Sequence, residues 1–126
     1  MKLAQIRIML DAEVLCGVEW LDKDVRSACG SDLMSDVLAF TKEQALLLTG
    51  LTNIQVIRTA EMSDLVAIMF VRGKRPGADV IEMARKMQIP LLTTNKPMYE
   101  ACGVLYEDGL AGCSLKEEPC CCQSRE

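Results

Sequence analysis

The chain contains no histidine, and it is poor in aromatic residues, with one Trp, two Tyr and two Phe among 126 residues. Without histidine, the side chain that most often serves as a general base near neutral pH is missing. A nucleic-acid-binding protein uses lysine and arginine for the phosphates and aromatic rings for the bases. The net charge of −4 and the few rings therefore argue against nucleic acid as a partner.

Long apolar runs and phosphate-binding loops are also missing. No stretch approaches the roughly 20 apolar residues of a transmembrane helix. The N-terminus has Lys2 and Arg7 inside its apolar pattern and lacks the core of an export signal. Neither G-x-x-x-x-G-K-[ST] nor G-x-G-x-x-G occurs. We therefore expect a cytoplasmic protein that has no contact with a membrane and is not an enzyme.

What the chain does have is an alternation of apolar strands and amphipathic helices. Three apolar runs each end at a polar turn that a helical pattern follows, which predicts parallel strands joined by right-handed crossovers. The pattern predicts strands over 13–17, 24–30, 45–49, 66–71 and 91–93, and helices over 3–10, 33–40, 53–62, 76–87 and 98–106. The expected inward residues of the middle three helices include Leu33, Val37, Leu38, Val56, Ile57, Met62, Val80, Ala84 and Met87.

The predicted fold class is α/β: a single three-layer domain with a mostly parallel sheet flanked by helices. The first two strands have no crossover pattern of this kind, so they leave room for a mixed sheet. We place the domain at residues 1–112, because 126 residues suit one domain. Residues 113–126 have no apolar period, and we expect this cysteine-rich tail to be disordered.

The seven cysteines fall into two groups. Their odd number and the expected reducing compartment favour free thiols over a disulfide framework. Cys16, Cys29 and Cys102 lie in apolar segments and are expected to be buried as small apolar side chains. Zinc or an iron–sulfur cluster at the tail is a minor alternative, because thiolates bind such metals but the spacing lacks C-x-x-C. We predict no cofactor and no metal site at Cys113, Cys120, Cys121 and Cys122.

The three polar turns should meet at one edge of the sheet, where open α/β sheets bind ligands. The turn at 49–53 would supply backbone amides at a helix start, and the turn at 72–77 would supply three cations that suit phosphate. We predict an anion site lined by Gly50, Thr52, Asn53, Arg72, Gly73, Lys74, Arg75 and Thr93.

Simpler interpretations of these residues remain open. Gly50 and Asn53 can serve only to make a turn and cap a helix, and a charged turn can be a solvated loop. Near these turns, either Ser31 or Asp32 can cap the following helix, while Asp36 remains in solvent.

By residues 49–58 and 70–76, supported by 32–38 and 98–103, the chain resembles DRTGG-domain proteins over residues 1 to about 112. It is similar to the stand-alone group related to the N-terminal region of HPr serine kinase. The resemblance implies an α/β fold and a regulatory, usually non-catalytic, role. In some pyrophosphatases the regulatory region with this domain responds to adenine nucleotides. Stand-alone members resemble proteins encoded near iron hydrogenase and NADH-linked electron-transfer components.

The chain departs from the motif that gives the family its name. The Asp-Arg of that motif corresponds to Leu51-Thr52 here, and its Thr-Gly-Gly corresponds to Val71-Arg72-Gly73. A kinase activity like that of the HPr relatives is excluded by the missing phosphate-binding loop.

Two functions follow as hypotheses. The first is a non-catalytic regulatory or sensor module that binds an anionic small ligand, in particular an adenine nucleotide. The second is a homodimeric interaction protein that docks onto a hydrogenase or another NADH-linked oxidoreductase complex.

Overall fold

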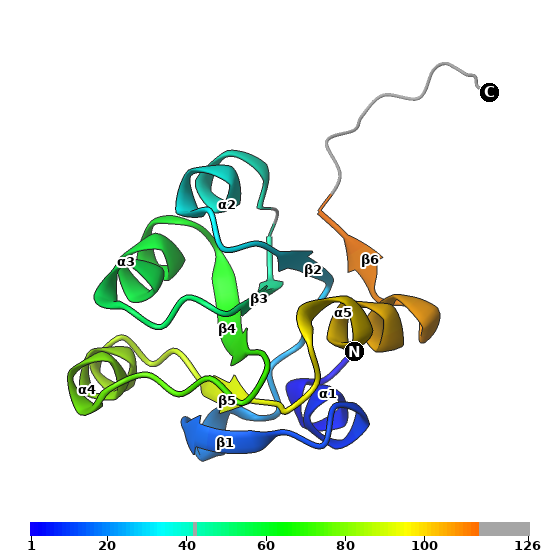
Figure 1. Ribbon diagram of the computed structural model, residues 1–126, viewed down its shortest axis with the longest axis horizontal. Coiled ribbons are helices and arrows are strands. Elements are labelled where there is room, and N and C mark those ends of the chain that lie inside the picture. The colour runs from blue at the N-terminus through cyan, green and yellow to red at the C-terminus, as the bar shows by residue number, and fades with distance from the viewer. Residues whose placement is uncertain (42, 114–126) are drawn as a thin grey trace.

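A six-stranded sheet, in the order β1-β5-β4-β3-β2-β6, forms the middle of the protein (Figure 1). The computed structural model describes residues 1–41 and 43–113. Strands β2 to β6 run parallel to one another, and β1 runs antiparallel to β5. The strands are β1 (Glu13–Cys16), β2 (Ser27–Gly30), β3 (Ala45–Thr49), β4 (Leu65–Phe70), β5 (Leu91–Thr93) and β6 (Ala111–Gly112).

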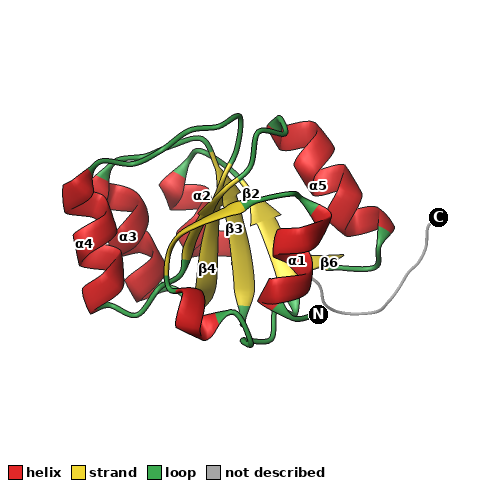
Figure 2. Cartoon of the chain, turned by 90° about the horizontal axis from the view of Figure 1, so that it is seen from below, coloured by secondary structure: helices red, strands yellow, loops and turns green. Residues whose placement is uncertain are grey.

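Helices cover both faces of this sheet and give the three predicted layers (Figure 2). Three helices pack on one face: α2 (Met34–Phe40), α3 (Ile54–Met62) and α4 (Ala78–Lys86). Two helices pack on the other: α1 (Leu3–Met9) and α5 (Met98–Glu107). None of the described helices is long and apolar enough to span a membrane. The predicted fold class is confirmed.

The central strand β3 shows why the sequence folds this way. All five of its residues are buried, as expected for a parallel strand covered on both sides. Leu47 packs with α2, α3 and α4, whereas Leu46 and Leu48 pack with α1 and α5. Successive side chains of one strand therefore hold two separate apolar cores, one on each face.

Strand β1 makes the sheet mixed, and its direction affects the surface described below. Glu13 pairs with Thr93, the last residue of β5. Because β1 runs opposite to the other strands, its first residue lies at the edge where their last residues lie. Glu13 therefore lies beside the carboxyl-terminal ends of the parallel strands.

Several sequence expectations need correction. The short helix Val18–Trp20 and strand β6 have no counterpart in the predicted elements, and β2 begins at Ser27 rather than at residue 24. The expected inward residues Leu33, Leu38, Met62 and Met87 are exposed, because each helix is shorter or turned relative to the simple apolar period. The boundary at residue 112 and the disorder of the tail remain predictions, since 114–126 lie outside the described residues.

The three cysteines expected inside the domain do lie in apolar surroundings. Cys16 is buried, and Cys29 and Cys102 are half-buried. Burial raises the pKa of all three thiols, which disfavours the thiolate form. These cysteines therefore act as small apolar side chains.

Two glycines give opposite predictions for the same substitution. Gly17 has a φ of +87°, and a Cβ there would stand 2.7 Å from the Pro90 Cα, so Gly17→Ala should lower the free energy of unfolding by about 2 kcal/mol or more. Gly103 lies inside α5, and a Cβ added to it would have no atom within 4 Å, so Gly103→Ala should raise the free energy of unfolding by up to about 1 kcal/mol. Urea denaturation of both variants checks this; equal effects would contradict it.

Candidate functional site

The carboxyl ends of β2, β3, β4 and β5 meet at one edge of the sheet, because these strands are parallel and adjacent. We call this the carboxyl edge. The segments that follow the strands there are 31–32, 50–53, 71–75 and 94–96. All eight predicted site residues lie on these segments or at the strand ends that precede them, so the predicted grouping of the turns at one edge is what the topology produces.

The turn after β4 has an unusual backbone. Arg72 and Gly73 have φ values of 56° and 68°, and the Lys74 amide donates to the Val71 carbonyl at 3.1 Å, as in a type I′ turn. Both inner amides are engaged across the edge: Arg72 N donates to Lys96 O at 2.9 Å and Gly73 N donates to Thr94 O at 2.8 Å. The turn therefore offers side chains, and not these two amides, to a ligand.

The turn after β3 is held by a carboxylate from the neighbouring strand. Asp32 Oδ1 accepts hydrogen bonds from the Gly50 amide at 2.7 Å and from the Thr49 hydroxyl at 2.8 Å. Neither of the two predicted caps, Ser31 or Asp32, is the N-cap of α2: that residue is Leu33, and it has no side-chain cap. The Gly50 amide, which we expected to be free for a bound anion, therefore donates to the Asp32 carboxylate.

These contacts keep Asp32 charged. The Gly50 amide and then the Thr49 hydroxyl lower the pKa of the Asp32 carboxyl, and the positive charges of Arg72 and Lys74 lower it further. An acid and two cations from the ends of two strands therefore share this part of the carboxyl edge.

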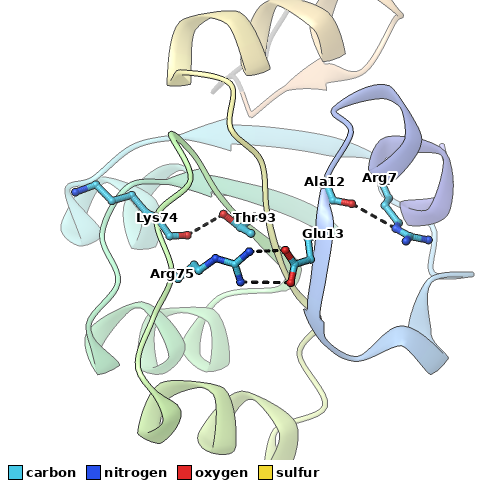
Figure 3. Close-up of polar contacts among 6 residues, drawn as sticks. All are labelled: Arg7, Ala12, Glu13, Lys74, Arg75 and Thr93. Atoms are coloured by element: carbon cyan, nitrogen blue, oxygen red, sulfur yellow. Dashed lines mark hydrogen bonds and ion pairs between the residues drawn. The ribbon is translucent and has the colours of Figure 1, made fainter.

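Arg75 has a different partner from the one predicted. Its guanidinium group forms a two-pronged ion pair with the Glu13 carboxylate, and one of the two contacts, from Nη1 to Oε2, is 3.3 Å long (Figure 3). This pairing lowers the pKa of the Glu13 carboxyl. Arg75 thereby joins the cationic turn to the antiparallel strand β1, and its charge is balanced inside the protein.

Thr93 also makes a structural contact. Its hydroxyl donates to the Lys74 carbonyl at 2.8 Å, while the Lys74 ammonium group points away from this contact (Figure 3). The next hydroxyl, of Thr94, donates to the Leu10 carbonyl at 2.7 Å. The Thr93 hydroxyl therefore holds the turn that carries the cations, and the Thr94 hydroxyl ties the loop after β5 to the end of α1.

Asn53 caps α3 as expected, with its side-chain oxygen accepting from the Gln55 amide at 3.0 Å. The cations Arg72 and Lys74 form no ion pair with the described residues. Thr52 is half-buried on the turn after β3. The predicted anion site does not include Asp32, Glu13 or Lys96, because their roles depend on strand order and direction.

Metal ligation finds no support in the described part of the chain. No group of three or more Cys, Asp or Glu side chains there lies close enough to hold an ion. Cys113 contacts the Ser27 hydroxyl, with 3.3 Å between Sγ and Oγ. Cys120, Cys121 and Cys122 lie outside the described residues, so the alternative of a metal bound by the tail stays a prediction.

Comparison with known proteins agrees with this architecture. The family model of the DRTGG domain matches residues 5–107. The chain belongs to the DRTGG-domain family. DRTGG domains are regulatory modules and not catalytic ones, which agrees with the expectation that this protein is not an enzyme. The relationship to HPr kinase is not shown by these comparisons.

One similar solved structure comprises the CBS and DRTGG domains of the regulatory region of Clostridium perfringens pyrophosphatase, complexed with its activator diadenosine tetraphosphate. The TM-score is 0.65 at 18% sequence identity, and the match covers 82% of this chain but 45% of that one. At this identity the likeness shows a shared fold. A search of curated proteins found no match.

The contacts of Asp32 predict an acid-dependent contribution to stability. Because its pKa is lowered in the folded state, its stabilisation is present above the unfolded value of about 3.9 and is lost as the pH falls through the lowered value. Asp32→Asn should therefore reduce the free energy of unfolding at pH 7 by about 0.5 kcal/mol, a small effect because the side chain is exposed.

Urea denaturation at pH 7, 5 and 3 measures this effect. The difference between the wild type and Asp32→Asn should shrink below pH 4 and vanish at lower pH. Asp22→Asn is the matched control, since Asp22 is exposed, lies outside the helices and forms no side-chain hydrogen bond or ion pair with the described residues. A difference that stays constant with pH would show that the Asp32 charge does not stabilise the Gly50 turn.

Proposed function

We propose that this protein is a non-catalytic regulatory module that binds an anionic small ligand at the carboxyl edge of its sheet. The observation that carries this proposal is the pair of cations, Arg72 and Lys74, on a turn whose backbone is fixed from both sides. A rigid turn loses little conformational freedom on binding, so its cations are already placed for an anion.

The charge of the surrounding surface supports an anionic ligand. Arg75 is neutralised by Glu13, and Asp32 is occupied with the Gly50 turn. Arg72 and Lys74 therefore give this part of the edge a local positive charge on a chain whose net charge is −4. Arginine suits phosphate in particular, because its planar guanidinium group can donate two parallel hydrogen bonds.

We propose a nucleotide, and specifically an adenine nucleotide, as the ligand. The pyrophosphatase regulatory region that shares this fold is complexed with diadenosine tetraphosphate, which carries both adenine and phosphate groups. In this chain Arg72, Lys74 and Thr52 would contact the phosphate, with Gly50, Asn53 and Gly73 shaping the turns around it. Arg75 is paired with Glu13 and would not contact the ligand, whereas Thr93 would act indirectly, through its hydrogen bond to the Lys74 carbonyl.

The relationship to HPr kinase, the homodimer and the cytoplasmic location remain predictions. The comparisons name neither a hydrogenase nor another oxidoreductase. The alternative of an interaction protein on such a complex gains no support from them.

A pair of arginine variants tests the proposed site. AMP, ADP or ATP at millimolar concentration should raise the melting temperature of the wild type, because a ligand that binds only the folded state stabilises it. Arg72→Asn should weaken binding about tenfold or more, through the loss of a charge-assisted hydrogen bond. Asparagine is chosen because it tolerates the positive φ of this position.

The matched control is Arg75→Gln, which removes the same charge three residues away from a side chain already paired with Glu13. Its nucleotide affinity should stay close to that of the wild type. No thermal shift with a panel of adenine and guanine nucleotides would refute the proposed function. Equal losses in both arginine variants would refute the assignment of Arg72 as a direct contact.

A further inference from the structure

A groove runs beside α5, between this helix and the β2–β6 end of the sheet. Its volume is about 760 Å³, and most of its lining is apolar or small, including Ala28, Gly30, Leu48, Cys102, Leu110 and Gly112. Its charged lining residues are Lys96, Glu100 and Glu107. Pockets for small ligands typically occupy about 300–1,000 Å³ and have mostly apolar walls with a few polar groups. The groove has the size and chemistry of such a pocket.

Glycine at two positions explains why the groove is open and α5 still lies close to the sheet. A Cβ at Gly30 would stand 2.9 Å from the Cys102 Sγ, so α5 approaches β2 closely only because this residue has no side chain. At Gly103, on the α5 wall, an added Cβ would have no atom within 4 Å. The β6 strand pairs with Ser27 and Ala28, and Gly30 lies beyond that pairing.

The loop after β5 connects the groove to the cationic turn. Lys96 lines it, and the Lys96 carbonyl accepts the hydrogen bond from the Arg72 amide at 2.9 Å. Tyr99, at the start of α5, also lines the groove and is 88% exposed. The groove therefore has apolar walls, an exposed aromatic ring and charged residues of both signs, and the loop after β5 leads from it to the cationic turn.

We infer that the groove receives the purine base of a nucleotide whose phosphate lies at Arg72 and Lys74. This inference rests on the proposed function and adds a second contact region to it. A planar, largely apolar ring suits the groove walls, and Tyr99 offers a face for stacking. The two carboxylates in the groove disfavour a phosphate there, and the cations of the turn attract it, which sets the direction of the ligand.

The experiment compares AMP, adenosine and ribose 5-phosphate by isothermal titration calorimetry. The base should make AMP bind about tenfold or more tighter than ribose 5-phosphate, since stacking of one base contributes on this scale. Gly103→Leu places a side chain over the groove at a helical position where the larger residue costs no helix stability. This variant should bind AMP no more tightly than ribose 5-phosphate, and its affinity for ribose 5-phosphate should equal that of the wild type.

Ala39→Leu is the matched control, an exposed alanine on α2 at the opposite face of the sheet. It should bind all three compounds as the wild type does. Arg72→Asn should weaken the binding of AMP and of ribose 5-phosphate by the same factor and leave the binding of adenosine unchanged.

Other outcomes separate the two proposals. If AMP and ribose 5-phosphate bind equally tightly, the groove does not hold the base, although the anion site stands. If adenosine alone binds and Gly103→Leu abolishes this binding, the groove holds the base and the anion site is wrong. If Gly103→Leu changes only the oligomeric state in analytical ultracentrifugation, the groove is a contact between two copies of the chain and the inference is overturned.

Discussion

Backbone polar groups at the ends of buried strands need hydrogen-bond partners, and this requirement shapes the whole carboxyl edge. The Gly50 amide is satisfied by Asp32, and the amides of Arg72 and Gly73 by carbonyls of the loop after β5. The ends of β3 and β4 are thus held by groups from neighbouring segments. These three amides are used to build the edge and are not open to a ligand.

The sequence predicts strand bounds best where a strand is buried on both faces. The bounds of β3 and β5 agree with the prediction, because a strand covered on both faces is a continuous apolar run, which here ends at a polar residue. It failed at β6, where two exposed residues pair with β2 and carry no apolar signal. The exposed Leu38 and Met62 show the same limit, since a helical period does not say where a helix turns away from its core.

In the candidate site, too, some positions could be predicted from the sequence and some contacts could not. The sequence placed Arg72 and Lys74 at the correct edge, because turns after parallel strands share one side of a sheet. It could not pair Arg75 with Glu13, since that contact requires β1 to run antiparallel and to lie beside β5. Nor could it bring Asp32 to Gly50, which requires β2 to neighbour β3. Charges close in sequence therefore differ in role: Arg75 is balanced internally, whereas Arg72 and Lys74 have no ion-pair partner among the described residues.

Strand order brings charged side chains close to the turn where this chain lacks the Asp-Arg pair of the family motif. Leu51 and Thr52 stand where the motif has an acid and a base, so the first turn has no charge of its own. In space, Asp32 brings a carboxylate to this turn from the end of β2, and Arg72 and Lys74 act on that carboxylate from the end of β4. The carboxylate and the cations thus follow different strands, β2 and β4. Since a ligand phosphate would share the cations with Asp32, the affinity of the edge depends on the balance between this fixed carboxylate and the two positive side chains.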